Sequence, residues 1–484
     1  MDESNNHPIV KQAGFIAGPL AFILLASLVS TDFISPGAGK VLAVAAWMII
    51  WWISEAAPVP VTALLPLITF PFLGIMKMSE AAIPYANPII FLFMGGFMIA
   101  LALEKHRVHE RIALNLVRIT GTSGNGIILG FTIATGFISM WISNTATAMM
   151  MLPIAISVIN LLRRTTTDAI TIGERNFGIA LMLVIAYAAN IGGIATIIGT
   201  PPNVVFIGLL NQFGHEKISF GTWMLVGLPL SLVVMGLGYF VITRFIFPNH
   251  LPKISGADAL IKNRLTDLGP MRREEKLVLT IFTLTSLLWI FQQPINLLLG
   301  NELLNDTNIG MAGGALMFVV PANFTQFKFL LVWKDTEKLS WGILILFGGG
   351  LCLAQGLSSA GIIQAVGSYI AQQSQSVNWL LFGLITASIF ITELMSNVAL
   401  VQIFIPVVFG IATNLGIDPI LLGMPVTLGA SMAFMFPVAT PPNAIVFSSG
   451  HMKVKDMMKA GFVMNILSLI VIYLAAKLLI PLIL

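Results

Sequence analysis

The chain has 484 residues, of which 57% are hydrophobic and only 10% are charged. A soluble domain cannot bury so large an apolar fraction, so the composition excludes an ordinary soluble protein and indicates a polytopic membrane protein. The single cysteine, Cys352, excludes an internal disulfide and a cysteine-based metal site. The net charge is only +4, and the basic clusters more readily flank membrane helices than bind nucleic acid, so no nucleic-acid partner is expected.

Windows of about 20 apolar residues predict eleven membrane-spanning helices in an all-α fold. The first apolar stretch, Phe15 to Ser30, could be a cleaved signal peptide. No small-residue cleavage site follows it, so we expect it to be retained as a helix. The eleven predicted helices are centred near residues 23, 46, 68, 95, 187, 233, 284, 315, 348, 428 and 469.

The distribution of Lys and Arg predicts the orientation. With the N-terminus in the cytoplasm and eleven crossings, all but four of the 25 basic residues face the cytoplasm, and the C-terminus is external. The expected location is the plasma membrane, which is the inner membrane in a bacterium. The four external basic residues would be Lys40, Lys77, Lys217 and Lys477.

Two further apolar stretches, residues 125–162 and 376–414, carry a Ser-Asn pair near the middle. Each stretch would enter and leave by one face of the membrane, the first from the cytoplasm and the second from outside. Periodicity does not distinguish two full spans from a re-entrant helical hairpin. We favour the hairpin, because its tip would then meet the second polar motif at membrane depth.

Three sequence landmarks occur twice in the same order. A Gly-rich segment (FLFMGGFMIALA, then LILFGGGLCLAQ) precedes a Ser-Asn pair, and a Thr-Pro-Pro-Asn motif follows (GTPPNVVF, then ATPPNAIVF). Each copy holds an odd number of crossings, so the second copy would be inverted, as is typical of secondary transporters. The predicted organisation is an N-terminal helix (1–37), a first inverted repeat (38–246), a cytoplasmic linker (247–273) and a second inverted repeat (274–484).

The Thr-Pro-Pro-Asn motif is expected to break a helix. Residues 177–210 would run about 51 Å as one helix, well beyond a bilayer core of about 30 Å. Pro201 and Pro202 lack an amide hydrogen, so the carbonyls of Ile197 and Ile198 would lose their donors. Unpaired carbonyls cannot face lipid, so they would line a polar cavity or coordinate a ligand. The second copy of the motif would act in the same way.

These motifs suit two kinds of ligand. Freed carbonyls with Ser, Thr and Asn oxygens make a neutral cage for an alkali cation such as Na⁺, without the carboxylates that Ca²⁺ usually recruits. Helix N-termini at the motifs would offer amides and positive dipole ends to an anion. No Lys or Arg occurs in residues 119–162, 176–216 or 339–452, so helix ends and bound cations would neutralise that anion. Anion binding would then depend on sodium, which is a mechanism for symport.

Each motif alone has an ordinary structural explanation. Ser and Thr often bond to their own helix, Pro-Pro often only kinks one, and small residues such as Gly95 permit close packing. The duplication at matching positions favours a site instead. Glu393, the acid nearest a hairpin tip, could carry a proton, interact with a cation or anchor backbone amides. An enzyme is disfavoured because no Ser-His or paired-Asp arrangement lies at a common depth in the membrane. A channel is disfavoured because two hairpins that meet end to end indicate alternating access rather than a continuous pore.

The chain resembles the divalent anion/sodium symporters, which carry dicarboxylates, citrate or sulfate. The residues that carry this resemblance are Ser143-Asn144-Thr145, Ser396-Asn397 and the two Thr-Pro-Pro-Asn motifs. The resemblance implies a homodimer in membrane lipid, with a fixed scaffold and an elevator-type transport domain that comprises the hairpins and the broken helices. We expect Na⁺-coupled symport of a small divalent anion, most simply a C4-dicarboxylate such as succinate, malate or fumarate. The alternatives are citrate or sulfate symport, or dicarboxylate exchange.

The resemblance also implies the site residues, with Na⁺ as the coupling ion and no organic cofactor. Val398 stands where a symmetric Ser-Asn-Thr pair would have threonine, which leaves the exact anion open. The substrate would contact Asn144, Thr145, Thr200, Pro201, Asn397, Val398, Thr440 and Pro441. The first sodium site would use Ser139, Ser143, Asn144 and the backbone of Gly199, and the second would use Thr392, Met395, Ser396, Asn397 and Ala439.

Overall fold

The structure, a computed structural model, describes residues 8–28, 36–165, 171–215, 217–251, 253–254, 256–373 and 376–483. These residues are mostly helical, and their one sheet is a two-stranded antiparallel hairpin of β1 (Pro321–Asn323) and β2 (Lys328–Phe329). Among them, nine helices are long and apolar enough to cross a bilayer. The number is ten if the bent pair α14 (Arg273–Ile290) and α15 (Gln292–Leu299) is one span.

The predicted all-α membrane fold is therefore confirmed, while the number of eleven spans stays a prediction. Helices are present at all eleven predicted centres, but those near residues 68, 315 and 428 are short. The three short helices are α4 (Leu65–Phe72), α16 (Asp306–Val319) and α21 (Pro419–Ala430).

The chain forms two compact units, each of which combines segments from both predicted repeats. Unit 1 consists of Met1–Phe91, Val204–Lys217 and Ser340–Ala430, and unit 2 of Leu92–Asn203, Ile218–Leu339 and Ser431–Leu484. Helices α6 (Pro88–Lys105) and α11 (Pro201–Gln212) each contribute to both units. The division of the chain into inverted repeats remains a prediction.

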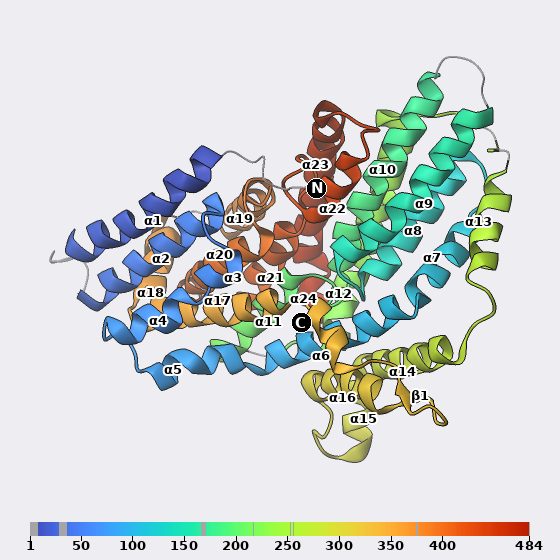
Figure 1. Cartoon of the computed structure of the whole chain (residues 1–484). Helices are drawn as coiled ribbons and strands as arrows, with labels where there is room; N and C mark the ends of the chain where they lie inside the picture. Colours follow the sequence, from blue (N-terminus) through green and yellow to red (C-terminus); the bar gives the residue numbers. More distant parts are fainter. Residues whose placement is uncertain are drawn as a thin grey trace. The chain divides into compact units, whose positions relative to one another are not determined.

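In unit 1, α1 lies along α2 (Figure 1), and Phe15 of α1 stacks on Trp51 of α2. A buried apolar cluster that includes Trp52, Phe70 and Cys352 joins α2, α4 and α17. Helix α20 packs against α18 and α21, and α19 packs against α21. The helices of this unit are α1 (Pro8–Leu28), α2 (Pro36–Ser54), α3 (Val59–Thr62), α4, α5 (Met78–Ala82), the 3₁₀ helix Ile83–Ala86, α17 (Trp341–Ser359), α18 (Ile362–Gln373), α19 (Val377–Ile391), α20 (Asn397–Leu415) and α21.

In unit 2, α8, α9 and α10 lie side by side (Figure 1), and every residue of α10 from Phe177 to Gly193 is buried. The two helices α8 and α10 approach closely because Gly192 lies against the backbone of Gly136, where a methyl group would not fit. The helices here are α7 (Val108–Ile119), α8 (Gly124–Ser139), α9 (Asn144–Thr165), α10 (Ile172–Gly193), α12 (Phe220–Val241), the π-helical turn Ile242–Ile246, α13 (Ala257–Asp267), α14, α15, α16, the 3₁₀ helix Trp333–Lys338, α22 (Pro441–Ser448), α23 (Val454–Leu478) and α24 (Ile480–Ile483).

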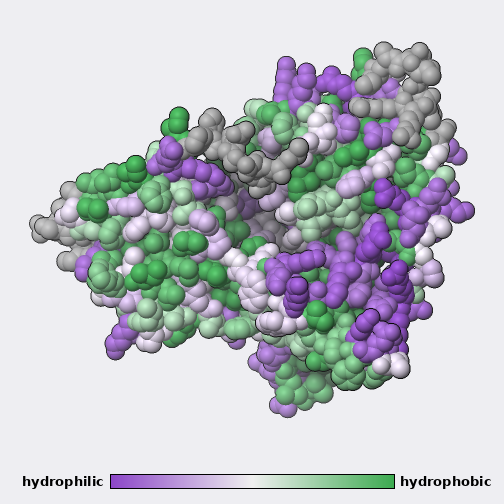
Figure 2. All heavy atoms as spheres, viewed as in Figure 1, coloured by the Kyte–Doolittle hydropathy of each residue, from purple (hydrophilic) through white to green (hydrophobic). Residues whose placement is uncertain are grey.

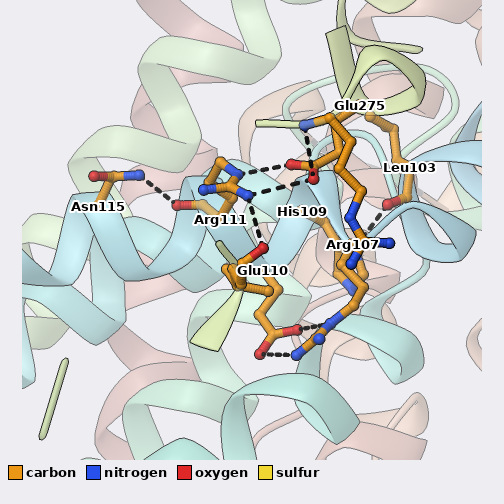
Figure 3. A network of polar contacts seen from close by, with 9 residues as sticks. Leu103, Arg107, His109, Glu110, Arg111, Asn115 and Glu275 are labelled. Carbon is orange, nitrogen blue, oxygen red and sulfur yellow. Dashed lines mark hydrogen bonds and ion pairs between the residues drawn. The ribbon is translucent and has the colours of Figure 1, made fainter. Parts of the chain in front are cut away.

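An ion pair with little exposure ties α7 to the first turn of α14 (Figure 3). Arg111 Nε donates to Glu275 Oε2 at 2.7 Å and Arg111 Nη2 to Glu275 Oε1 at 3.3 Å. The side chains are only 17% and 7% exposed. Glu275 also accepts the backbone N–H of Arg272 at 3.3 Å, so the same carboxylate satisfies an amide at the start of α14.

Hydrophilic side chains gather over α13 and the start of α14 (Figure 2), within the part of unit 2 that also holds the Arg111–Glu275 pair. Asp258, Lys262 and Arg264 on α13 are exposed. The stretch predicted as the linker therefore contains a polar surface helix, which suits a position outside the hydrocarbon core.

Candidate functional site

The first Ser-Asn pair begins a helix. Helix α8 ends at Ser139 and α9 begins at Asn144, which gives a helix–break–helix element in the stretch predicted as the first hairpin. The Ser143 Oγ accepts the N–H of Ala146 at 3.2 Å, as an N-cap residue does. Ser143 is exposed, and its place in the predicted sodium site stays a prediction.

Three oxygen atoms meet at the break between α8 and α9. The Ser139 Oγ lies 2.7 Å from Asn144 Oδ1 and 2.7 Å from the carbonyl oxygen of Ala189 on α10. A hydroxyl carries one hydrogen, so it can donate to only one of these two acceptors. With the amide oxygen of Asn144 turned toward Ser139, the cluster has one hydroxyl hydrogen for two acceptors, and a cation bound among the oxygens would relieve that shortage.

The second Ser-Asn pair shows the same arrangement within unit 1. Helix α19 ends at Ile391 and α20 begins at Asn397. The Thr392 Oγ1 lies 2.7 Å from Asn397 Oδ1 and 2.6 Å from the carbonyl oxygen of Ala430, the last residue of α21. Thr392 is fully buried. The two copies of the motif therefore build the same oxygen cluster, one in each unit.

The helix that carries the first Thr-Pro-Pro-Asn motif is broken, as predicted, but over a longer segment than expected. Helix α10 ends at Gly193 and α11 begins at Pro201. The prediction that the carbonyls of Ile197 and Ile198 mark the break was too narrow. Asn203 explains the difference, because its Nδ2 donates to Gly193 O at 3.3 Å and to Thr196 O at 2.8 Å, and so holds the unwound backbone.

The second break is held by the same residue at the same spacing. Asn443 Nδ2 donates to Ala433 O at 3.1 Å and to Phe436 O at 3.0 Å, again to the residues ten and seven positions before it. Both Asn203 and Asn443 are fully buried. The last residue of the motif is thus a structural clamp for the break.

Replacing Asn203 by alanine should lower the melting temperature of the purified protein and its uptake rate together. The change removes both side-chain donors, and each buried carbonyl left without one costs about 1–3 kcal/mol. Asn211, on the same helix but exposed, is the matched control, and Asn211→Ala should leave both quantities near wild type. Equal melting temperatures for the two variants would show that Asn203 does not hold the break.

Asn144 meets the first broken helix. A methyl group added at Gly193 would lie 2.7 Å from Asn144 Oδ1 and 3.1 Å from Thr200 Cβ. One added at Gly199 would collide with Gly193 O and lie 3.0 Å from Met140 O. The predicted residues Asn144, Gly199 and Thr200 are therefore neighbours, and the two glycines allow this close approach.

Thr440, at the start of α22, is held by a residue that sequence reasoning missed. Asn190 Nδ2 on α10 donates to Thr440 Oγ1 at 3.1 Å and to Ala433 O at 3.2 Å. Asn190 is 2% exposed. The signal was visible as one amide side chain in the apolar run of α10, but the sequence did not identify its partners. The last turn of α10 thus makes two contacts. Asn190 contacts the start of α22, and Gly193 contacts Asn144.

The remaining predicted residues lie at the same breaks, but not all within one unit. Met395, Ser396, Asn397 and Val398 belong to unit 1 with Thr392, whereas Ala439 belongs to unit 2. Met395 and Val398 pack against the apolar cluster of unit 1. Glu393 is 2% exposed in the break between α19 and α20. In unit 2, Thr145 and Pro201 are half-buried and Pro441 is exposed at the start of α22.

In the part of the chain that the structure describes, no group of three or more His, Cys, Asp or Glu side chains could hold a metal ion. The two histidines three apart in sequence contact carbonyls instead. His106 Nε2 lies 2.9 Å from Leu330 O, and His109 Nδ1 lies 2.9 Å from Leu103 O. Burial lowers the pKa of His109.

Comparisons with known proteins identify a matching family and similar chains. The family described as "sodium:sulfate symporter transmembrane region" matches residues 13–484. The sodium-dependent dicarboxylate transporter SdcS of Staphylococcus saprophyticus is 39% identical over 99% of this chain and 93% of its own length. SdcS of Staphylococcus aureus (strain bovine RF122) is 39% identical over 97% of this chain and 91% of its own length.

Two solved structures share the fold at low sequence identity. The Alcanivorax borkumensis YdaH transporter has a TM-score of 0.57 and 13% identity, and covers 98% of this chain and 99% of its own. Neisseria gonorrhoeae MtrF has a TM-score of 0.56 and 12% identity, and covers 98% of this chain and 96% of its own. The predicted family resemblance is confirmed by the match over nearly the whole chain. This chain belongs to the sodium:sulfate symporter family of membrane transport proteins.

Proposed function

We propose that this protein is a secondary active transporter that carries a small divalent anion, a C4-dicarboxylate such as succinate, malate or fumarate, together with Na⁺. The observation that carries the proposal is the duplicated oxygen cluster. Ser139 with Asn144 and Ala189 O, and Thr392 with Asn397 and Ala430 O, each bring three oxygens together with one hydroxyl hydrogen. Neutral oxygens crowded in this way suit a hard monovalent cation.

The two clusters refine the proposed sodium ligands. In the first site, Ser139 Oγ, Asn144 Oδ1 and Ala189 O are ligands, while Ser143 acts as the N-cap of α9. In the second site, Thr392 Oγ1, Asn397 Oδ1 and Ala430 O are ligands. The proposal keeps the backbone of Gly199 in the first site and Met395 and Ser396 in the second, and Ala439 is retained there on the family resemblance alone.

The anion would be held by helix N-termini rather than by a cationic side chain. Helices α9, α11, α20 and α22 begin at Asn144, Pro201, Asn397 and Pro441, next to the proposed substrate residues. No Lys or Arg lies in the surrounding sequence. Free amides and positive dipole ends at a helix start attract an anion, and each bound Na⁺ would add a full positive charge. Anion affinity should therefore rise with sodium concentration.

The substrate assignment is supported by the two SdcS relatives, which are named sodium-dependent dicarboxylate transporters. The family name refers to sulfate, and Val398 removes one hydroxyl from the second motif, so citrate and sulfate symport and dicarboxylate exchange are the competing activities. Competition of unlabelled succinate, citrate and sulfate for labelled succinate in one uptake assay ranks these anions.

We further propose that the protein is a homodimer in the plasma membrane, with eleven crossings, a cytoplasmic N-terminus and an external C-terminus. The excess of Lys and Arg on the proposed cytoplasmic side supports this orientation. Within each protomer, the two hairpins and the broken helices would form a transport domain that moves as an elevator relative to a fixed scaffold. The duplicated motifs support this division, because in transporters with inverted repeats the site lies between the repeats.

Proteoliposomes that contain the purified protein should accumulate labelled succinate only when an inward sodium gradient is present. Replacing external sodium by potassium or choline should reduce uptake to the level of protein-free vesicles, because neither cation would complete the two oxygen clusters. If the uptake rate in potassium equals the rate in sodium, transport is not coupled to sodium and that part of the proposal is wrong. Uptake that requires internal dicarboxylate instead of sodium would establish exchange.

A further inference from the structure

We infer that Asn190 is a positioning residue that sets the direction of the Thr440 hydroxyl and makes it a hydrogen-bond donor to the transported anion. The inference rests on the proposed function, because it assigns a role to a side chain behind the proposed substrate contact. Asn190 lies in the last turn of α10, and Thr440 lies immediately before α22. Both residues belong to unit 2.

The orientation of the Asn190 amide is determined by its partners. Its nitrogen lies 3.2 Å from Ala433 O, and a carbonyl oxygen can only accept. The amide nitrogen, with its two hydrogens, must therefore face Ala433 and Thr440, and its second hydrogen goes to Thr440 Oγ1 at 3.1 Å. Asn190 is a donor in both bonds.

The Thr440 hydroxyl then accepts on both available sides. It receives the Asn190 N–H at 3.1 Å and, more weakly, the backbone N–H of Asn443 at 3.5 Å. A hydroxyl oxygen has two lone pairs and one hydrogen. With both lone pairs directed at N–H groups, the hydrogen points away from them, and the described residues supply no recorded acceptor for it. Thr440 is only 6% exposed, so water does not readily fill that role.

A buried hydroxyl fixed as a donor suits an acceptor-only ligand. Carboxylate and sulfate oxygens accept and do not donate, and hydrogen bonds to charged groups are stronger than those between neutral groups. A freely rotating hydroxyl would have to be ordered when the anion binds, whereas this one is ordered beforehand. For Thr200, the matching residue of the first motif, no such side-chain donor is recorded among the described residues, so the two threonines are not equivalent.

A double-mutant cycle tests the inference. Uptake of labelled succinate, citrate and sulfate is measured under a sodium gradient, and KM is compared for the anion that the wild type carries. Asn190→Ala should raise KM for that anion about tenfold with a smaller change in Vmax, as expected for the loss of one ordered bond to a charged group. Thr440→Val should do the same. The double variant Asn190→Ala/Thr440→Val should be no worse than Thr440→Val, because Asn190 acts through the hydroxyl.

Two controls separate positioning from a structural role. In the Thr440→Ser background, which keeps a hydroxyl, Asn190→Ala should still raise KM about tenfold. In the Thr200→Val background, the effect of Asn190→Ala should be additive. Asn190→Asp, close in volume but an acceptor, should raise KM at least as much as Asn190→Ala, because the carboxylate would take the Thr440 hydrogen.

Additive effects of Asn190→Ala and Thr440→Val on KM would overturn the inference while leaving the proposed function intact. Failure of both Asn190 variants to fold, judged by size-exclusion chromatography and melting temperature, would make Asn190 a structural residue and would also overturn it. A wild type that carries none of the three anions would instead overturn the proposed function, and this inference with it.

Discussion

Asn144→Ala should reduce sodium-driven succinate uptake at least about a hundredfold while the protein remains folded. Asn144 Oδ1 shares the hydrogen of Ser139 in the first oxygen cluster, and the residue begins α9 beside Gly193 and Thr200. Its loss removes a proposed sodium ligand and a proposed substrate contact. Losing two such contacts costs about 3 kcal/mol of binding free energy in total, which corresponds to a loss of about a hundredfold in uptake. Initial rates in proteoliposomes, normalised to reconstituted protein, measure the effect.

The matched control is Asn115→Ala on α7. Asn115 Nδ2 donates to Arg111 O one turn earlier, so the amide is engaged locally, and uptake should stay within about twofold of wild type. Asn144→Asp separates the two proposed roles, because it retains a side-chain oxygen for sodium but repels the anion. Sodium should still raise the melting temperature of Asn144→Asp by mass action, whereas succinate should not. Wild-type uptake by Asn144→Ala would remove this residue from the site.

Arg111→Met should produce a large loss of stability. The change keeps an apolar stem but removes the partner of Glu275, whose side chain is only 7% exposed. Removing one member of a buried ion pair leaves an uncompensated charge and costs about 3–5 kcal/mol. The melting temperature of the detergent-solubilised protein measures the loss, which should be several degrees.

Arg107→Met is the matched control on the same helix. Arg107 pairs with Glu110 three residues later and is 57% exposed, and such pairs contribute about 0–1 kcal/mol. The double variant Arg111→Met/Glu275→Gln should recover much of the loss, because no charge is then left unpaired. If Arg111→Met and Arg107→Met melt at the same temperature, the contact between α7 and α14 does not depend on this pair.

The positions at which helices start could be predicted from the sequence because the signals for them are local. Ser143 provides an N-cap oxygen, and Pro201 and Pro441 cannot continue a preceding helix, so α9, α11 and α22 begin where the motifs indicate. The number of spans was less predictable. A short helix such as α21 reads as part of a longer apolar window, because hydropathy does not show where a backbone unwinds.

Most of the site geometry could not be predicted, for two physical reasons. Ala189 and Ala430 contribute their backbone carbonyls to the two oxygen clusters, and the side-chain type of a residue does not indicate such a role. The partners of Asn190 and Asn203 depend on how the unwound segments fold back, which is a tertiary contact rather than a periodic one. The sequence could therefore identify the polar residues but not which atoms they meet.

The clamps at Asn203 and Asn443 have a consequence for membrane insertion. Each clamp satisfies carbonyls only ten and seven residues earlier in the chain, so the partners emerge from the ribosome almost together. Closing so short a loop costs little entropy and takes far less time than translation. An unwound segment closed in this way can leave the translocon with these carbonyls already paired, before the helices that follow it have been synthesised.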